Sequence, residues 1–133
     1  MANDKTQIKN YNSQLLAFVG DAVHTLYVRE HICKHHVGKP NDLHTLATKY
    51  IKASGQSDMV DKLLPLLNAD ELDVFRRARN YKTNNIAKNA KVTDYKRATG
   101  FEAVLGYLYL IGNKDRLNEI LKLVVGELDE NWR

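Results

Sequence analysis

The stretch LLAFVGDAVHTLYVR, residues 15–29, places a single aspartate, Asp21, inside an apolar run. An ionised carboxylate in apolar surroundings is costly unless a partner pairs with it. Asn12 and Ser13 stand just before the run and are good helix caps, which predicts a helix over 14–35. Both the packing of this helix and any chemistry at Asp21 therefore depend on which group pairs with its carboxylate.

A second apolar stretch, FEAVLGYLYL at 101–110, repeats this pattern, with Glu102 as its only charge. Each acid has a glycine nearby, Gly20 directly before Asp21 and Gly106 one turn after Glu102. A glycine inside a helix costs about 1 kcal/mol relative to alanine, and close approach of another backbone is one reason to accept that cost. We therefore expect the two helices to cross near their glycines and to bring the two acids together.

The rest of the chain predicts an all-α fold, a helical bundle that forms a single domain over 1–133. The expected breaks are SGQSD at 54–58, which interrupts or kinks a helix, and the polar stretch 82–97, which we expect to be a loop. Gly112 and Asn113 are expected to end the helix that carries Glu102. Apolar residues at helical spacing predict the remaining helices over 42–53, 58–67, 69–80, 99–111 and 115–130.

Composition narrows the class of protein. The chain has 133 residues, of which 44% are hydrophobic, enough for one core without covalent staples. Its one cysteine, Cys33, excludes an intramolecular disulfide. The first residues lack the apolar core of a signal peptide, and no apolar run is long enough to span a membrane. We expect a cytoplasmic protein with no membrane association.

The charge is concentrated in one segment. The net charge is +4, but residues 76–97 hold eight basic side chains against Asp94 alone, so this segment is +7 and the remainder is −3. A basic segment on a mildly acidic body favours a polyanionic partner, although a solvated surface loop is the ordinary alternative.

Two carboxylates held together in a poorly solvated place repel each other, and a hard divalent cation relieves that repulsion. Mg²⁺ prefers oxygen ligands and often uses only one or two carboxylates in addition to water and substrate phosphate. The alternative for each acid alone is a buried carboxylate bonded to His24 or to a tyrosine. A metal site beside a polyanion-binding segment indicates phosphodiester hydrolysis.

The same two stretches resemble the signature motifs of the ribonuclease III family. LLAFVGDAV is similar to the pattern Leu-Glu-Phe-Leu-Gly-Asp-Ala-Val, and FEAVLGYLYL to a second motif, Asp-x-x-Glu-Ala followed by Ile/Leu-Gly-Ala. Two of the four acids of that family are absent, since Ala17 and Thr99 stand in their places. No double-stranded-RNA-binding domain is expected after the catalytic one. These features resemble the Mini-ribonuclease III subfamily of bacteria.

The resemblance implies a homodimeric, Mg²⁺-dependent endoribonuclease that cleaves double-stranded RNA and leaves 5′ phosphates. It implies that Asp21 and Glu102 are the catalytic residues and hold Mg²⁺, with Thr99 as a candidate for holding a metal-bound water. It further implies maturation of the 5′ and 3′ ends of 23S rRNA from its precursor stem, with ribosomal proteins or the pre-50S particle as further partners. The basic side chains that are candidates for RNA contact are Arg76, Arg77, Arg79, Lys82, Lys88, Lys91, Lys96 and Arg97.

Two other functions remain open at this point. The loss of two acids is also what a non-catalytic double-stranded-RNA-binding or ribosome-associated helical protein would show. A helical metal phosphohydrolase that acts on nucleotides would carry a His-Asp dipeptide, and this chain has none.

Overall fold

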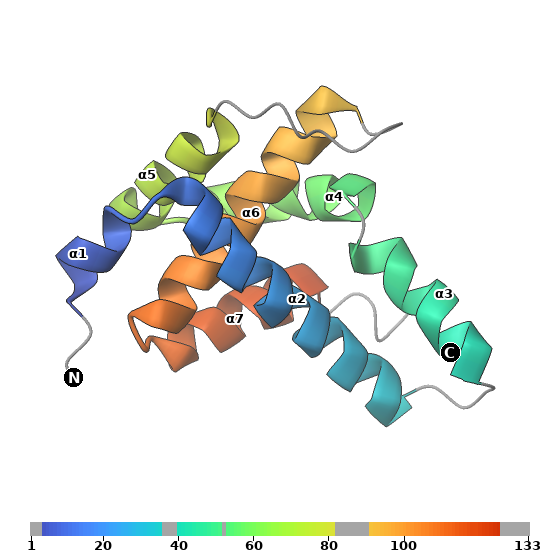
Figure 1. The fold of residues 1–133 in the computed structure, drawn as a ribbon. Helices are drawn as coiled ribbons and strands as arrows, with labels where there is room; N and C mark the ends of the chain where they lie inside the picture. Colours follow the sequence, from blue (N-terminus) through green and yellow to red (C-terminus); the bar gives the residue numbers. More distant parts are fainter. Residues whose placement is uncertain (1–3, 36–39, 52, 82–90, 126–133) are drawn as a thin grey trace.

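The computed structural model describes residues 4–35, 40–51, 53–81 and 91–125. All regular structure within these ranges is helical, which confirms the all-α prediction (Figure 1). No helix within them is long and apolar enough to cross a membrane. The elements are α1 (Lys5–Lys9), α2 (Ser13–His35), α3 (Pro40–Ile51), α4 (Ala53–Leu63), a 3₁₀ turn η1 (Leu64–Leu66), α5 (Ala69–Arg79), α6 (Val92–Leu110) and α7 (Lys114–Val125).

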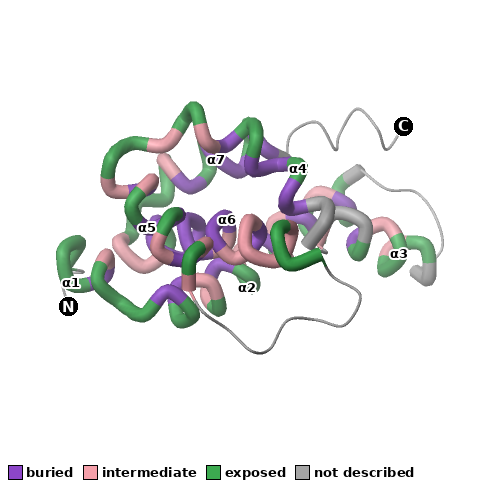
Figure 2. The backbone as a smooth tube through the Cα atoms, turned by 90° about the horizontal axis from the view of Figure 1, so that it is seen from above, coloured by how far each residue is buried: buried purple, intermediate pink, exposed green. Residues whose placement is uncertain are grey.

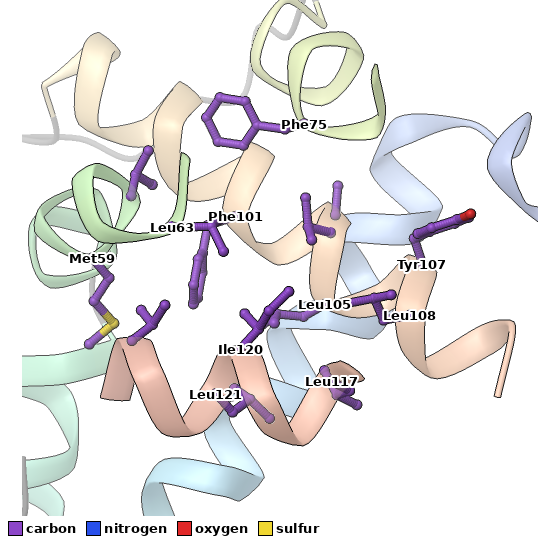
Figure 3. Packing of buried hydrophobic residues seen from close by; sticks show 14 of the residues in the cluster. Met59, Leu63, Phe75, Phe101, Leu105, Tyr107, Leu108, Leu117, Ile120 and Leu121 are labelled. Carbon is purple, nitrogen blue, oxygen red and sulfur yellow. The ribbon is translucent and has the colours of Figure 1, made fainter. Parts of the chain in front are cut away.

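Helix α6 lies at the centre of the bundle. Figure 2 shows it between α2 and α7, with its middle buried. Figure 3 shows its apolar side chains packed against those of α4, α5 and α7, which form the core. The labelled core side chains are Met59, Leu63, Phe75, Phe101, Leu105, Tyr107, Leu108, Leu117, Ile120 and Leu121. Because α6 packs against so many elements, the side chains of its buried middle are held in place by most of the fold.

Helices α2 and α6 cross at their glycines, as the sequence predicts. A Cβ atom on Gly20 would lie 1.6 Å from the backbone oxygen of Glu102, and one on Gly106 would lie 1.9 Å from that of Leu16. No real side chain tolerates such distances, so only glycine permits this approach of the two backbones. The crossing, visible in Figure 1, sets α2 and α6 close enough for their acids to meet.

A buried ion pair connects the start of α5 to α7. Asn68 and Glu71 form a capping box at the N-terminus of α5. The carboxylate of Glu71, only 1% exposed, also accepts two hydrogen bonds from Arg116, at 3.0 Å from Nε and 2.9 Å from Nη2. Hydrogen bonds from Asn68 and Arg116 lower the pKa of Glu71 in spite of its burial. The pair is therefore held charged and fixes α7 beneath α5 and α6.

The structure departs from the predicted boundaries at three places. SGQSD does not break a helix but lies inside α4, because packing against α6 outweighs the low helix propensity of glycine and serine. Residues 92–97 form the first turns of α6 and not a loop, and the short helix α1 was not predicted. Gly112, with a φ of 77°, follows the end of α6 as expected. Residues 82–90 and 126–130 lie outside the described residues.

Candidate active site

The helix crossing brings Asp21 of α2 and Glu102 of α6 into hydrogen-bonding contact. Both acids line a cavity of about 270 Å³, whose walls also include parts of α5 and the start of α6. The residues that line it are Gln14, Ala17, Phe18, Asp21, Ala78, Tyr81, Tyr95, Lys96, Thr99 and Glu102. The structure thus brings the two carboxyl groups together as predicted, and both face a cavity large enough for part of a ligand.

The two acids differ in environment. Asp21 is exposed at the cavity, whereas Glu102 is mostly buried. Burial raises the pKa of Glu102 to about 9, with further contributions from the hydrogen bond and the negative charge of Asp21. Near neutral pH, Glu102 is therefore protonated and donates to Asp21. Within the residues that the structure describes, Asp21 pairs with Glu102 across the crossing, and no hydrogen bond joins it to a histidine or a tyrosine.

A buried amide lies behind Glu102 and was not predicted. Gln56 of α4, 2% exposed, hydrogen-bonds Glu102 and also lies 3.0 Å from Nδ1 of His24 on α2. His24 is fully buried, and this burial lowers its pKa to about 4, so the imidazole is neutral. Nothing in the sequence marks Gln56, because it stands in a polar stretch that suggests a break between helices.

The other candidate at the site is Thr99, one turn before Glu102. Its hydroxyl donates to the backbone oxygen of Tyr95 at 2.9 Å, and its side chain lines the cavity. The hydroxyl oxygen retains acceptor capacity toward the cavity. Thr99 thus lines the same cavity as the two acids, and its role in holding a water stays a prediction.

The donor set at the site suits a hard divalent cation. In the described part of the chain, no group of three or more His, Cys, Asp or Glu side chains is placed to hold a metal ion. Asp21 and Glu102 are close enough to share one proton, and a cation that replaces that proton would find two carboxylates beside an open cavity. Mg²⁺ commonly binds through two carboxylates and completes its shell with water and phosphate, so these residues fit it.

Comparisons with known proteins agree with this geometry. The family model described as Ribonuclease III domain matches residues 14–113, a range that contains both acids. The chain belongs to the ribonuclease III family. Its relatives include Mini-ribonuclease 3 of Clostridium tetani, 42% identical over 128 residues, which cover 96% of this chain and 85% of that protein. Mini-ribonuclease 3 of a Thermoanaerobacter species is 43% identical over 126 residues, covering 95% and 89% of the two chains.

A solved structure shares the same fold. The crystal structure of protein FN1578 from Fusobacterium nucleatum superimposes with a TM-score of 0.78 at 28% sequence identity, covering 89% of this chain and 94% of that one. The family model and the curated relatives place the chain among the Mini-ribonuclease 3 proteins of the ribonuclease III family and identify it as an endoribonuclease that acts on double-stranded RNA. This family is typically metal-dependent.

The basic side chains of this ribonuclease III domain have different surroundings. Arg97 donates to the hydroxyl and backbone oxygens of Ser57 and to Asp61, at 2.9, 3.0 and 2.7 Å, so its guanidinium ties α6 to α4. Arg77 donates to Asp73 and to the backbone oxygen of Lys9, which ties α5 to α1. Both arginines contribute to the packing of helices.

Other basic candidates are better placed for a polyanion. Arg76 and Lys91 are exposed, and Lys96 lines the cavity that holds the two acids. Arg79 lies over the ring of Phe75, 5.7 Å from its centroid, and donates to Asn80. Lys82 and Lys88 lie outside the described residues.

A second hollow of about 490 Å³ adjoins the first in the ribonuclease III domain. It is lined by Arg76, Arg77 and Asn80 at the end of α5 and by residues 10–13, which run from the end of α1 to the first residue of α2. Tyr81 lines both hollows, so a chain of phosphates that leaves the acids would next meet arginine and amide donors.

Proposed function

We propose that this endoribonuclease uses Mg²⁺ to cleave a double-stranded stem of precursor 23S rRNA in the bacterial cytoplasm and so matures the 5′ and 3′ ends of that RNA within the pre-50S particle. One observation carries the proposal: the only two acids in the apolar motif stretches share a cavity, and Tyr81 on its wall also lines an arginine-lined hollow. We propose this rRNA as the substrate because maturation of 23S rRNA is typical of the family of the Mini-ribonuclease 3 relatives.

Each residue that lines the cavity has its own proposed role in the reaction. When bound, Mg²⁺ supplies Lewis-acid catalysis of phosphodiester hydrolysis. Asp21, exposed at the cavity, offers carboxylate oxygens to the cation, and Glu102 does so once it has lost its proton. Lys96 on the cavity wall offers a positive charge to a phosphate that enters, and Thr99 offers a hydroxyl. Attack of water at phosphorus with departure of the 3′ oxygen would leave a 5′ phosphate.

The first test removes one metal-binding charge at a time. Asp21→Asn and Glu102→Gln keep the size of each side chain but remove a carboxylate. Each is expected to lower the rate of duplex RNA cleavage by about 10³-fold or more, because stabilisation of charge in the transition state is lost. Duplex RNA binding, measured by fluorescence anisotropy, should change little, because affinity for the phosphates comes mainly from basic side chains and not from carboxylates.

The same variants separate the enzyme from its rival. A non-catalytic RNA-binding protein would show no Mg²⁺-dependent cuts in the wild type and no difference between the wild type and Asp21→Asn. Near wild-type cleavage by either variant would remove the catalytic assignment. Cuts in a generic duplex but not in the 23S precursor stem would leave the chemistry intact and reject the proposed substrate.

We also propose that the enzyme works as a homodimer whose interface includes an exposed apolar face of α2. Phe18 is 78% exposed, Leu26 61% and Leu15 58%, and these positions follow one another at helical spacing. So much exposed apolar surface on one helix indicates a partner. Phe18 also lines the cavity with Asp21, so a second copy on this face would border the site.

A further inference from the structure

A buried polar cluster lies directly behind the proposed metal ligands. It joins three helices through Glu102 of α6, Gln56 of α4 and His24 of α2. Gln56 and His24 are 2% and 0% exposed, and the ring of His24 also meets that of Phe101 edge-on at 5.2 Å. Buried polar side chains destabilise a fold unless they are hydrogen-bonded, so packing alone does not account for this cluster.

The hydrogen bonds have a definite direction. Nδ1 of a neutral His24 accepts from the side-chain nitrogen of Gln56 at 3.0 Å. The same amide nitrogen has a second hydrogen, and the Gln56 side chain hydrogen-bonds the carboxyl group of Glu102. Gln56 therefore acts as a double donor, held by an acceptor on α2 and directed at the carboxyl group on α6.

A neutral donor has an advantage at this position. A lysine or arginine would also orient the carboxylate, but its positive charge would oppose the binding of a cation. An apolar residue would leave the carboxyl group free to rotate and would favour its protonated form. An amide fixes the carboxyl group without competing with the metal, and ligand orientation by such outer contacts is general in metal sites.

We propose that Gln56 is a positioning residue that holds Glu102 in the orientation needed to bind a divalent cation, and that His24 serves as the buried acceptor that fixes Gln56. This inference rests on the proposed function, since it takes Glu102 as a metal ligand. It adds two residues to the site, one of them on a helix that carries neither acid.

The test measures metal binding apart from catalysis, with Mn²⁺ as the probe. Gln56→Met keeps the length of the side chain but removes both donors. We expect the Kd for Mn²⁺, measured by electron paramagnetic resonance of the free ion, to rise about tenfold or more. RNA cleavage should need more Mg²⁺ for half-maximal rate, and its rate at saturating Mg²⁺ should fall much less.

Ser57→Ala is the matched control. Ser57 is the next residue of α4, is 7% exposed and accepts a hydrogen bond from Arg97, and it does not share the hydrogen bond of Gln56 to Glu102. Its loss should lower the melting temperature and leave the Kd for Mn²⁺ at the wild-type value. A purely structural role for Gln56 predicts the same result for Gln56→Met, and that outcome would overturn the proposal.

Two variants of His24 keep the test decisive if Gln56→Met does not fold. His24→Asn retains an acceptor oxygen near the position of Nδ1, whereas His24→Leu removes it. Mn²⁺ binding should weaken in His24→Leu and be largely restored in His24→Asn, whereas wild-type affinity in both would contradict the proposal. The failure of the proposed function looks different, because Glu102→Gln would then also bind Mn²⁺ as the wild type does.

Discussion

At the residue scale, two acids in similar sequence contexts acquire different properties. Asp21 and Glu102 are each the only acid in an apolar stretch. Gly20 directly precedes Asp21, and Gly106 follows Glu102 by one helical turn. The fold exposes Asp21 at the cavity and buries most of Glu102, and this burial raises the pKa of Glu102 to about 9. A carboxyl group that is neutral without a cation and charged with one couples metal binding to the release of a proton.

This difference predicts how stability depends on pH in the metal-free protein. Unfolded Glu102 ionises near its ordinary pKa of 4.5, whereas folded Glu102 keeps its proton up to about pH 9. Between these values the folded state holds one proton more, so the free energy of unfolding should fall as pH rises, by at most about 1.4 kcal/mol per pH unit. The effect should end above pH 9.

Urea unfolding in EDTA between pH 7 and 9 measures this slope. His24, whose pKa is lowered to about 4, acts in the opposite sense but only below pH 6.5, so it does not disturb this window. Glu102→Gln cannot lose a proton and should make the profile flatter and the fold more stable near pH 8. Parallel profiles for the wild type and Glu102→Gln would show that Glu102 ionises normally.

Sequence reasoning found the two acids but not the residue that supports them. A lone charge among apolar residues is a conspicuous pattern, whereas Gln56 is one polar residue among several in SGQSD. Its burial depends on α4 packing against α6, which is a long-range contact that no local pattern records. The partner of Gln56, His24, also stood in an apolar stretch, and its role depends on the same packing.

At the element scale, the crossing of α2 and α6 was predictable because a glycine inside an apolar helix is costly unless another backbone approaches it closely. The start of α6 was not predictable from the sequence, because Thr93, Asp94 and Lys96 give its first turns the polar composition of a loop. These turns project beyond the core, so their side chains carry no apolar periodicity. Helix formation there follows from the buried continuation of α6, which packs against α2, α4 and α5.

The surroundings of the arginines predict different roles on α5 and α6. Arg76→Gln combined with Arg79→Gln should weaken duplex RNA binding about tenfold at low salt and reduce the steepness of its salt dependence, because fewer counterions are released. Arg97→Gln should instead lower the melting temperature, since it removes three hydrogen bonds between α6 and α4. Its salt dependence should match the wild type.

Fluorescence anisotropy of a labelled duplex across a salt series distinguishes these results. If the α5 variant binds RNA as the wild type does at every salt concentration, the end of α5 is an ordinary solvated surface. If Arg97→Gln alone alters the salt dependence while its melting temperature is unchanged, the RNA lies along α4 and not along α5.

At the scale of the whole molecule, the apolar face of α2 is the feature that packing within the monomer does not account for. The sequence predicts more apolar surface on this helix than its own domain needs, at Phe18, Val19, Ala22, Val23, Leu26 and Tyr27. Of these, Phe18, Ala22 and Leu26 are exposed, whereas Val19, Val23 and Tyr27 are partly buried. Tyr109 of α6, 51% exposed, is also open to solvent, whereas Tyr107 is buried. A closed two-fold assembly would cover the same face on both copies.

A duplex has two strands of opposite polarity, and one copy of the proposed Asp21–Glu102 site can cut only one of them. A two-fold axis relates opposite polarities, so a homodimer would present one site to each strand. We therefore expect sedimentation to show a dimer of the 15.2 kDa chain near neutral pH. When the wild type is mixed with Asp21→Asn and subunits exchange, the heterodimers should nick a single strand, while Asp21→Asn alone cuts neither.

Phe18→Asp should shift the protein to monomers and abolish paired cuts. A 15.2 kDa monomer that still cuts both strands in one binding event would exclude this arrangement.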